Sequence, residues 1–150
     1  MIDRTPSIVA DPDISFLEVL RRFAKHASVR GVFVVDRNQK LVGVLTRQDL
    51  LAWVGVTFGS EWFVRRLPAA RLTRLAHAET VRAACRPDSH LTAVRPSDAI
   101  DVALADMVAF DLIDVPVVDE RGRLVGDLRL TEVVAKAVEI AEDAASVSRA

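Results

Sequence analysis

The sequence predicts an α+β fold of two pseudo-twofold-related half-domains, each with the element order strand, helix, strand, strand, helix. An internal repeat is the first reason, because residues 29–45 align without a gap with residues 112–128 and eight of these positions are identical. Periodicity is the second, because the apolar spacing changes from helical to strand-like in the same order in both copies. A sheet of two or three strands in about fifty residues leaves one face uncovered. We therefore expect the two copies to pack sheet to sheet.

Each copy begins with residues that favour an amphipathic helix. A proline, Pro12 or Pro96, precedes apolar residues that recur three and four positions apart, which gives one buried stripe. The stripe consists of Phe16, Val19, Leu20 and Phe23 in the first copy and of Ile100, Ala103, Leu104 and Met107 in the second.

A β-hairpin and a short helix are expected next in both copies. Two Val-rich runs joined by a short polar turn, as at residues 32–45 and 115–128, are typical of a hairpin. The resulting division is repeat 1 at 7–54, an inserted helical connector at 55–90, repeat 2 at 91–142 and a C-terminal tail at 143–150.

The connector is rich in arginine. Residues 61–90 contain six Arg and three acidic residues. We expect one helix over residues 69–84, with Leu72, Leu75, Ala76 and Val81 inward and Arg71, Arg74 and Arg82 outward. Such a charge pattern favours a solvated helix face, and a contact with an anionic ligand or partner is the alternative.

The composition excludes several classes of protein. Of 150 residues, 51% are hydrophobic and 27% charged, which excludes a disordered or collagen-like chain. The net charge of −1 gives no broad basic field, so nucleic acid is not an expected partner. The lone Cys85 and the lack of a signal sequence or of an apolar run long enough to span a bilayer lead us to expect a cytoplasmic protein without membrane contact.

No catalytic motif stands out, so we expect a protein that is not an enzyme. The six glycines never cluster as a phosphate-binding loop requires, and no serine lies in a Gly-x-Ser-x-Gly turn. His26, His77 and His90 are too scattered to suggest a metal site. No catalytic residue, metal or catalytic cofactor is predicted.

The repeated pattern resembles a known family. A helix after Pro-x-x-x-apolar, then Val-Pro-Val-Val-Asp at 115–119 and Arg-Leu-Val-Gly at 123–126, is similar to a tandem pair of CBS domains, the Bateman module. The first copy departs from the family in having Phe33 where a proline is common. The resemblance implies a regulatory module whose clefts commonly bind an adenosine-containing molecule such as AMP, ADP, ATP or S-adenosylmethionine.

One motif of the first copy has residues suited to binding a nucleotide. Gly-Val-Leu-Thr-Arg-Gln-Asp at 43–49 matches the family's nucleotide motif, and on this resemblance Asp49 would bind the ribose hydroxyls and Thr46 the ribose or the first phosphate. A helix that begins near Arg47 favours an anion at its N-terminus, Asp49 offers two acceptor oxygens to adjacent hydroxyls, and Gly43 lets a ligand approach the backbone.

The same spacing has a purely structural interpretation. Thr-x-x-Asp before Leu50 and Leu51 is also a helix capping box, in which Thr46 and Asp49 bind backbone N–H groups. Spacing alone favours the cap, whereas the family resemblance favours the nucleotide site. The second copy has Arg129 and Glu132 at the corresponding positions, and we expect a degenerate site there, with Arg129 in an ion pair.

The resemblance also implies flanking residues for the first site. Arg30, Gly31 and Val32 of the first copy and Thr92, Ala93 and Val94 from the opening strand of the second would complete the pocket, with Arg95 or Arg47 on phosphates. The expected function is an adenosyl-ligand sensor that signals to an unknown regulated protein or to its own oligomer, with a homodimer expected. The alternative is a dimerisation or protein-interaction module with degenerate clefts.

Overall fold

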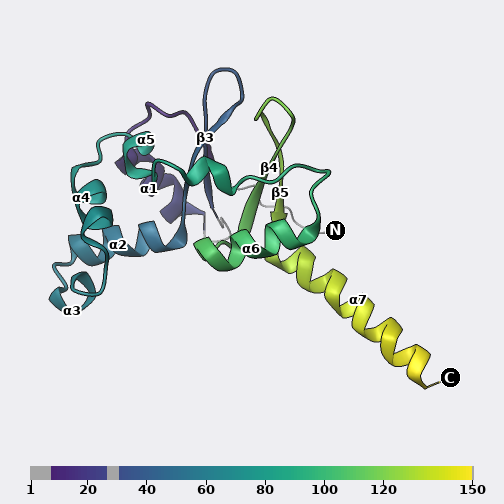
Figure 1. The fold of residues 1–150 in the computed structure, drawn as a ribbon. Coiled ribbons are helices and arrows are strands. Elements are labelled where there is room, and N and C mark those ends of the chain that lie inside the picture. The colour runs from purple at the N-terminus through teal and green to yellow at the C-terminus, as the bar shows by residue number, and fades with distance from the viewer. Residues whose placement is uncertain (1–7, 27–30, 150) are drawn as a thin grey trace.

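Two small sheets form the centre of the molecule (Figure 1). The computed structural model describes residues 8–26 and 31–149. In the first sheet β1 (Ile8–Ala10) runs parallel to β2 (Val32–Val35), which pairs antiparallel with β3 (Leu41–Leu45). In the second, β4 (Asp114–Val118) and β5 (Leu124–Arg129) are antiparallel.

Helices follow the strands in the predicted order. In the first repeat α1 (Phe16–Lys25) connects β1 to β2, and α2 (Arg47–Thr57) follows β3. In the second, α6 (Ile100–Phe110) precedes β4 and α7 (Leu130–Ser148) follows β5. The repeated α+β architecture is therefore confirmed.

The opening strand of the second repeat is shorter than predicted. Only Val94 pairs with β4, as a single parallel bridge to Val117. Its N–H donates to Pro116 O at 3.0 Å, and its carbonyl accepts from Val118 N–H at 2.8 Å. The 3₁₀ helix η1 (Ser89–Thr92) ends just before this point, so little extended chain remains to pair.

The connector holds three α-helices, α3 (Glu61–Val64), α4 (Ala69–His77) and α5 (Val81–Ala84). The prediction of one helix over residues 69–84 was wrong, because the chain is extended from Ala78 and the Thr80 side chain caps a new helix. The break allows Glu79 O to accept from Phe16 N–H at 2.9 Å, which ties the connector to the start of α1.

The two hairpins exchange hydrogen bonds through equivalent residues. Leu41 N–H donates to Gly122 O at 3.0 Å, and Leu124 N–H donates to Gln39 O at 2.9 Å. Leu41 aligns with Leu124 and Gln39 with Gly122, so each bond is the repeat-swapped image of the other. Gln39 and Gly122 share a left-handed conformation, with φ of 65° and 78°. This reciprocity marks the pseudo-twofold axis, beside which the two loops lie (Figure 1).

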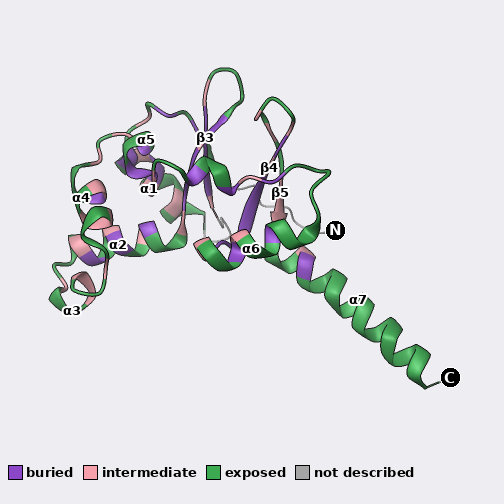
Figure 2. Ribbon diagram, in the orientation of Figure 1, coloured by how far each residue is buried: buried purple, intermediate pink, exposed green. Residues whose placement is uncertain are grey.

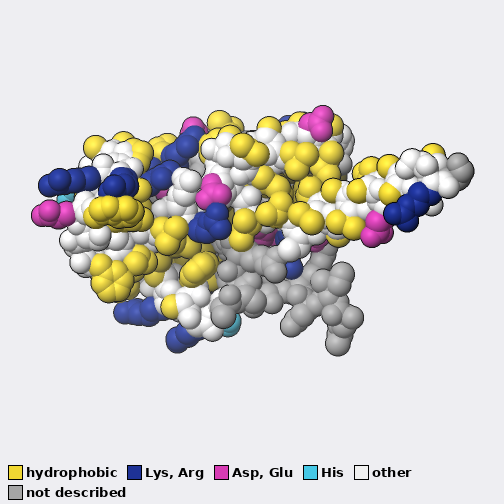
Figure 3. Space-filling view, turned by 90° about the horizontal axis from the view of Figure 1, so that it is seen from below, with side chains coloured by type: hydrophobic (Ala, Val, Ile, Leu, Met, Phe, Trp, Pro, Cys, Tyr) yellow, Lys and Arg dark blue, Asp and Glu magenta, His cyan; other side chains and the backbone are white. Residues whose placement is uncertain are grey.

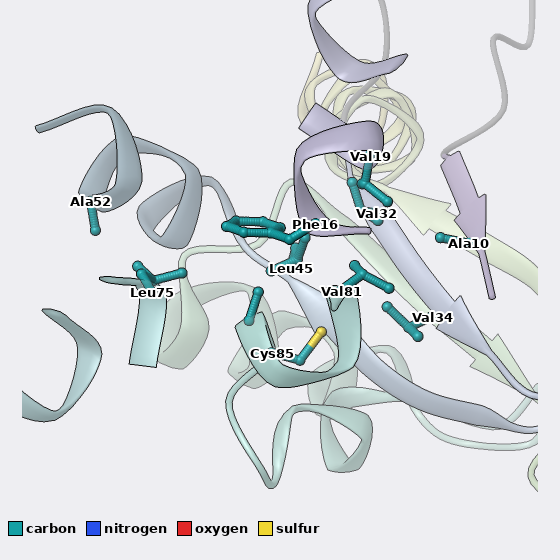
Figure 4. Close-up of a cluster of buried hydrophobic side chains, with 11 residues drawn as sticks. Ala10, Phe16, Val19, Val32, Val34, Leu45, Ala52, Leu75, Val81 and Cys85 are labelled. Atoms are coloured by element: carbon teal, nitrogen blue, oxygen red, sulfur yellow. The ribbon is translucent and has the colours of Figure 1, made fainter. Parts of the chain in front are cut away.

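Alternate residues of β2 serve two hydrophobic cores. Val32 and Val34 face a first core of α1, α2 and the connector, where Phe16, Leu45 and Val81 surround them (Figure 4). Phe33 and Val35 belong to a second core, which the second repeat completes through residues of its strands and helices. This second core contains Val94, Ala103, Met107, Leu112, Val115, Val118 and Val133.

Helix α7 projects from the body (Figures 1 and 2). It continues to Ser148, so the segment at 143–150 that was expected to be a tail is helical as far as that residue. Val133 is its one buried residue, and the residues after it are exposed up to Arg149. No helix in the described part of the chain is long and apolar enough to cross a membrane.

Because Phe33 lies in the core that both repeats share, Phe33→Ala is expected to destabilise them together. Its side chain is 2% exposed, and truncating such a phenylalanine costs about 3–5 kcal/mol. We expect tryptophan fluorescence, which reports on Trp53 and Trp62, and far-UV circular dichroism to shift to the same lower urea midpoint.

The matched control is Val108→Ala, since Val108 is 85% exposed and the substitution should leave both transitions in place. Two separate transitions in wild-type protein would contradict a shared core.

Candidate functional site

The Thr46 and Asp49 motif lies where β3 passes into α2. Thr46 caps the helix by accepting from Asp49 N–H at 3.1 Å, and Thr46 N–H donates to Asp49 Oδ2 at 3.1 Å. The Thr46 hydroxyl also donates to Oδ2, at 3.0 Å. The capping box inferred from the spacing is thus present, and it uses one carboxylate oxygen of Asp49.

The other oxygen of Asp49 binds arginines from the connector. Arg74 Nη2 donates to Asp49 Oδ1 at 2.7 Å, and Arg71 Nε lies 3.5 Å from the same atom. Asp49 is only 2% exposed, and a buried carboxylate requires such partners because desolvating an unpaired charge is costly. The prediction that Arg71 and Arg74 point outward was wrong.

A hollow lies over this ion pair, between the start of α2 and the end of α6. Its volume is about 50 Å³, whereas drug-sized ligands occupy pockets of roughly 300–1,000 Å³. The residues that line it are Val44, Thr46, Gln48, Asp49, Arg71, Arg86, Ser89, Thr92, Ala109 and Phe110. Side chains of both repeats and of the connector therefore meet there.

Arg86 forms part of the wall. Its guanidinium lies 4.7 Å from the centre of the Phe110 ring, and it binds Asp88 through two bonds of 2.6 and 3.1 Å. The bond from Arg86 lowers the pKa of Asp88 from its usual value. Arg86 thus bridges the segment before repeat 2 and the end of α6.

Two hydroxyls of η1 also line the hollow. Ser89 Oγ accepts from Val44 N–H at 2.9 Å, and Thr92 Oγ1 donates to Ser89 O at 2.7 Å. Thr92 therefore lies beside Thr46 and Asp49 as predicted, although it belongs to a 3₁₀ helix and not to a strand.

A second, smaller hollow lies on the other side of Thr46. Gly31, Thr46 and Arg47 line it together with Asp111 and neighbouring residues of the second repeat. Arg47 Nη2 donates to both carboxylate oxygens of Asp111 at 2.8 Å, so in this state Arg47 joins the repeats.

The remaining predicted site residues lie elsewhere. Val32 is fully buried in the first core. Val94 and Arg95 line a separate groove at the start of α6, and Ala93 packs against the second core. The structure does not bring Arg95 to Thr46 and Asp49, because the Val94 bridge holds that segment against β4. Arg30 lies outside the described residues.

Comparison with protein families decides the identity of the repeat. The model of the CBS domain matches residues 2–55 and 81–139. The chain belongs to the CBS domain family. Its second matched region begins at the connector helix α5, so α5 and η1 fall within this CBS region.

Solved CBS proteins share the fold. The CBSX2 structure in complex with AMP is 28% identical with a TM-score of 0.69, and the match covers 91% of this chain and 92% of that one. A CBS domain-containing protein from Thermotoga maritima is 26% identical with a TM-score of 0.66, over 89% of this chain and 86% of that one.

A curated relative is an enzyme. A tRNA-2-methylthio-N(6)-dimethylallyladenosine synthase 1 from Mycobacterium marinum is 32% identical over 124 residues, which are 82% of this chain and 22% of that protein. The chain thus spans about a fifth of that relative's length.

The second CBS repeat has different side chains at the motif. Arg129, only 7% exposed, lies 3.1 Å from the Asp127 carboxylate and occupies the N-cap position of α7. Glu132 lies in the first turn of that helix. The ion pair expected of Arg129 is therefore present.

Gly43 serves packing, contrary to the prediction that it admits a ligand. A Cβ atom there would lie 2.9 Å from Cys85 Sγ, so the connector fills the space beside this backbone. Gly126, its equivalent in the second repeat, has nothing within 4 Å of the same position. In the described residues no group of three or more His, Cys, Asp or Glu could hold a metal ion.

The connector arginines are the site residues that sequence reasoning did not find. Arg71 and Arg74 are three residues apart on α4, which places them on one helix face. The excess of arginine over acidic residues in the connector is visible in the sequence. Their partner Asp49 lies on α2, and nothing in the local sequence indicates that the two helices pack together.

The two glycines provide a matched test. Gly43→Ala is expected to lower the free energy of unfolding by about 1–3 kcal/mol, because Cys85 and the connector must shift. Gly126→Ala should change it by less than about 0.5 kcal/mol. Urea unfolding measures both, and equal effects would contradict the packing role of Gly43.

Cys85 is expected to be unreactive in the native protein. Burial, and to a smaller extent the neighbouring Asp49 carboxylate, raises the pKa of its thiol from 9.0 to about 12. At pH 8 the thiol should stay protonated and resist iodoacetamide until urea unfolds the chain, as mass spectrometry would show.

The same pKa difference gives a pH dependence of stability. The folded state holds the Cys85 proton more tightly, so this contribution is complete below about pH 9 and falls as the pH rises toward 12. Cys85→Ala should reduce the loss of unfolding free energy between pH 9 and 12. Rapid alkylation of native protein at pH 8 would contradict the burial of this thiol.

Proposed function

We propose that this CBS pair is a regulatory module that binds an adenine nucleotide in the hollow beside Thr46 and Asp49. The observation that carries the proposal is the position of this hollow, which joins the motif of the first repeat to Phe110 of the second and to Arg71 of the connector. A ligand there would contact all three parts of the chain.

The similarity to CBSX2 supports the choice of ligand. That protein was solved with AMP, and the two chains are similar over most of their lengths. The chemistry of the hollow agrees, because it combines hydroxyl groups and a carboxylate for ribose, an aromatic ring for a base and guanidinium groups for phosphate.

Binding on this proposal requires side chains to move. The hollow of about 50 Å³ is too small for a nucleotide, and Arg74, Arg71 and Thr46 occupy both oxygens of Asp49. A ligand that enters therefore favours an arrangement different from the closed one. The ligand can shift the equilibrium between the two arrangements only by as much as its affinities for them differ. Such a shift is how ligand binding would be communicated to a partner or to an oligomer.

A second candidate function is a dimerisation or interaction module with no ligand. The closed cleft favours it, and so do the apolar side chains exposed on the helices of the second repeat. Figure 3 shows hydrophobic side chains along α7. Those exposed on α6 and α7 include Ile100, Leu104, Val108, Leu130, Val134 and Val138.

Calorimetry on the full chain with AMP, ADP, ATP and S-adenosylmethionine distinguishes these functions. We expect AMP or a related nucleotide to bind, and Asp49→Asn to weaken binding by about tenfold or more through loss of a charged acceptor. Asparagine keeps the side-chain oxygen that caps α2 but loses the charge that pairs with Arg74, so thermal unfolding of the variant must first verify that it is folded.

The matched control is Glu132→Gln, which changes the equivalent position of the second repeat and should leave the dissociation constant within about twofold. Light scattering on the same samples reports the oligomeric state. Absence of binding by every ligand, together with a stable dimer, would replace the sensor with the interaction module.

A further inference from the structure

We infer that Arg71 makes this cleft selective for ligands that carry phosphate, and that neutral or cationic adenosyl compounds are excluded by the same residue. The inference rests on the proposed function and deepens it by naming the ligand class. Its evidence is the unequal way in which the two connector arginines hold Asp49.

Arg74 is a structural partner of Asp49. Its Nη2 donates to Oδ1 at 2.7 Å while its Nε donates to Ala84 O at 3.0 Å, which anchors the guanidinium at both ends. Arg74 is not among the residues that line the hollow. It therefore stays behind the carboxylate when a ligand approaches.

Arg71 is held more loosely and lines the hollow itself. Its Nε is 3.5 Å from Asp49 Oδ1, and its Nη1 donates at 3.2 Å to the side-chain oxygen of Gln48, which is exposed. Arg71 lines the hollow that Asp49 also lines. Access to Asp49 from the hollow thus requires Arg71 to give up its contact with the carboxylate.

The cost of that movement depends on the ligand's charge. A displaced guanidinium in a partly buried position, 18% exposed here, needs a new partner. A phosphate provides one through paired N–H donors, and the bond is charge-assisted. A neutral nucleoside leaves Arg71 without an anionic partner, and a sulfonium ligand adds a like charge beside it.

The rest of the lining favours an anion as well. The N-terminal turn of α2 faces the hollow through Thr46 and Gln48, and Arg86 lines it as well, although Asp88 pairs with that guanidinium. Among the residues that the structure describes, Asp49 is the single acidic one that lines this hollow. Once Arg74 neutralises Asp49, Arg71 gives the hollow an excess of positive charge.

The test compares AMP, adenosine, 5′-methylthioadenosine and S-adenosylmethionine by calorimetry on wild-type protein and on Arg71→Gln. Wild type should bind AMP at least about tenfold more tightly than the three compounds without phosphate. In Arg71→Gln, AMP should bind at least about fivefold more weakly, while adenosine should bind as tightly as before or more so.

Opposite changes for AMP and adenosine separate this role from general loss of structure, which would weaken both. The control is Arg65→Gln, because Arg65 is the C-cap residue of α3 with its side chain 80% exposed, and the substitution should leave every dissociation constant unchanged. Thermal unfolding of each variant verifies that it is folded.

The outcomes distinguish the two proposals. If adenosine or S-adenosylmethionine binds wild type as tightly as AMP, or if Arg71→Gln keeps the preference for AMP, the inference is overturned while the nucleotide site stands. If none of the four compounds binds wild type, the proposed function fails and the inference fails with it.

Discussion

The whole molecule depends on β2 being buried on both faces. Its four residues alternate between two cores, one closed by α1, α2 and the connector and the other by the second repeat. Neither a lone repeat nor a pair without the connector would cover this strand. The connector therefore belongs to the structural core, and this is why its arginines can reach the start of α2.

The same constraint explains the closed cleft. With α4 packed against α2, Asp49 is removed from water and takes Arg74 as its partner, so the capping box and the ion pair together satisfy its carboxylate. The structural and functional interpretations of Thr46 and Asp49 are compatible on this view. On the proposed function, this buried and fully paired carboxylate would become a ligand group only when a competing partner draws Arg71 away from it.

The fold could be predicted because its signals are local: the identical hairpin residues, the helical stripes and the Thr-x-x-Asp spacing all lie within short windows. The break between α4 and α5 could not, because the hydrogen bond from Phe16 N–H to Glu79 O that accompanies it joins distant segments. The same holds for Arg71 and Arg74, whose spacing is also that of a solvated face, and for Gly43, whose neighbour Cys85 comes from the connector. The position of Arg95 depended on how far the strand at Val94 extends.

Helix α7 has a mechanical consequence. It meets the body at β5 and through Val133 near its start, and its remaining length extends outward without further burial. Its 19 residues span about 28 Å at 1.5 Å per residue, so each degree of rotation of the second repeat displaces the distal end by about 0.5 Å. If ligand binding changes the angle between the repeats, as the proposed function requires, the helix would act as a lever arm that converts a small rotation into a displacement large enough for a neighbouring molecule to detect.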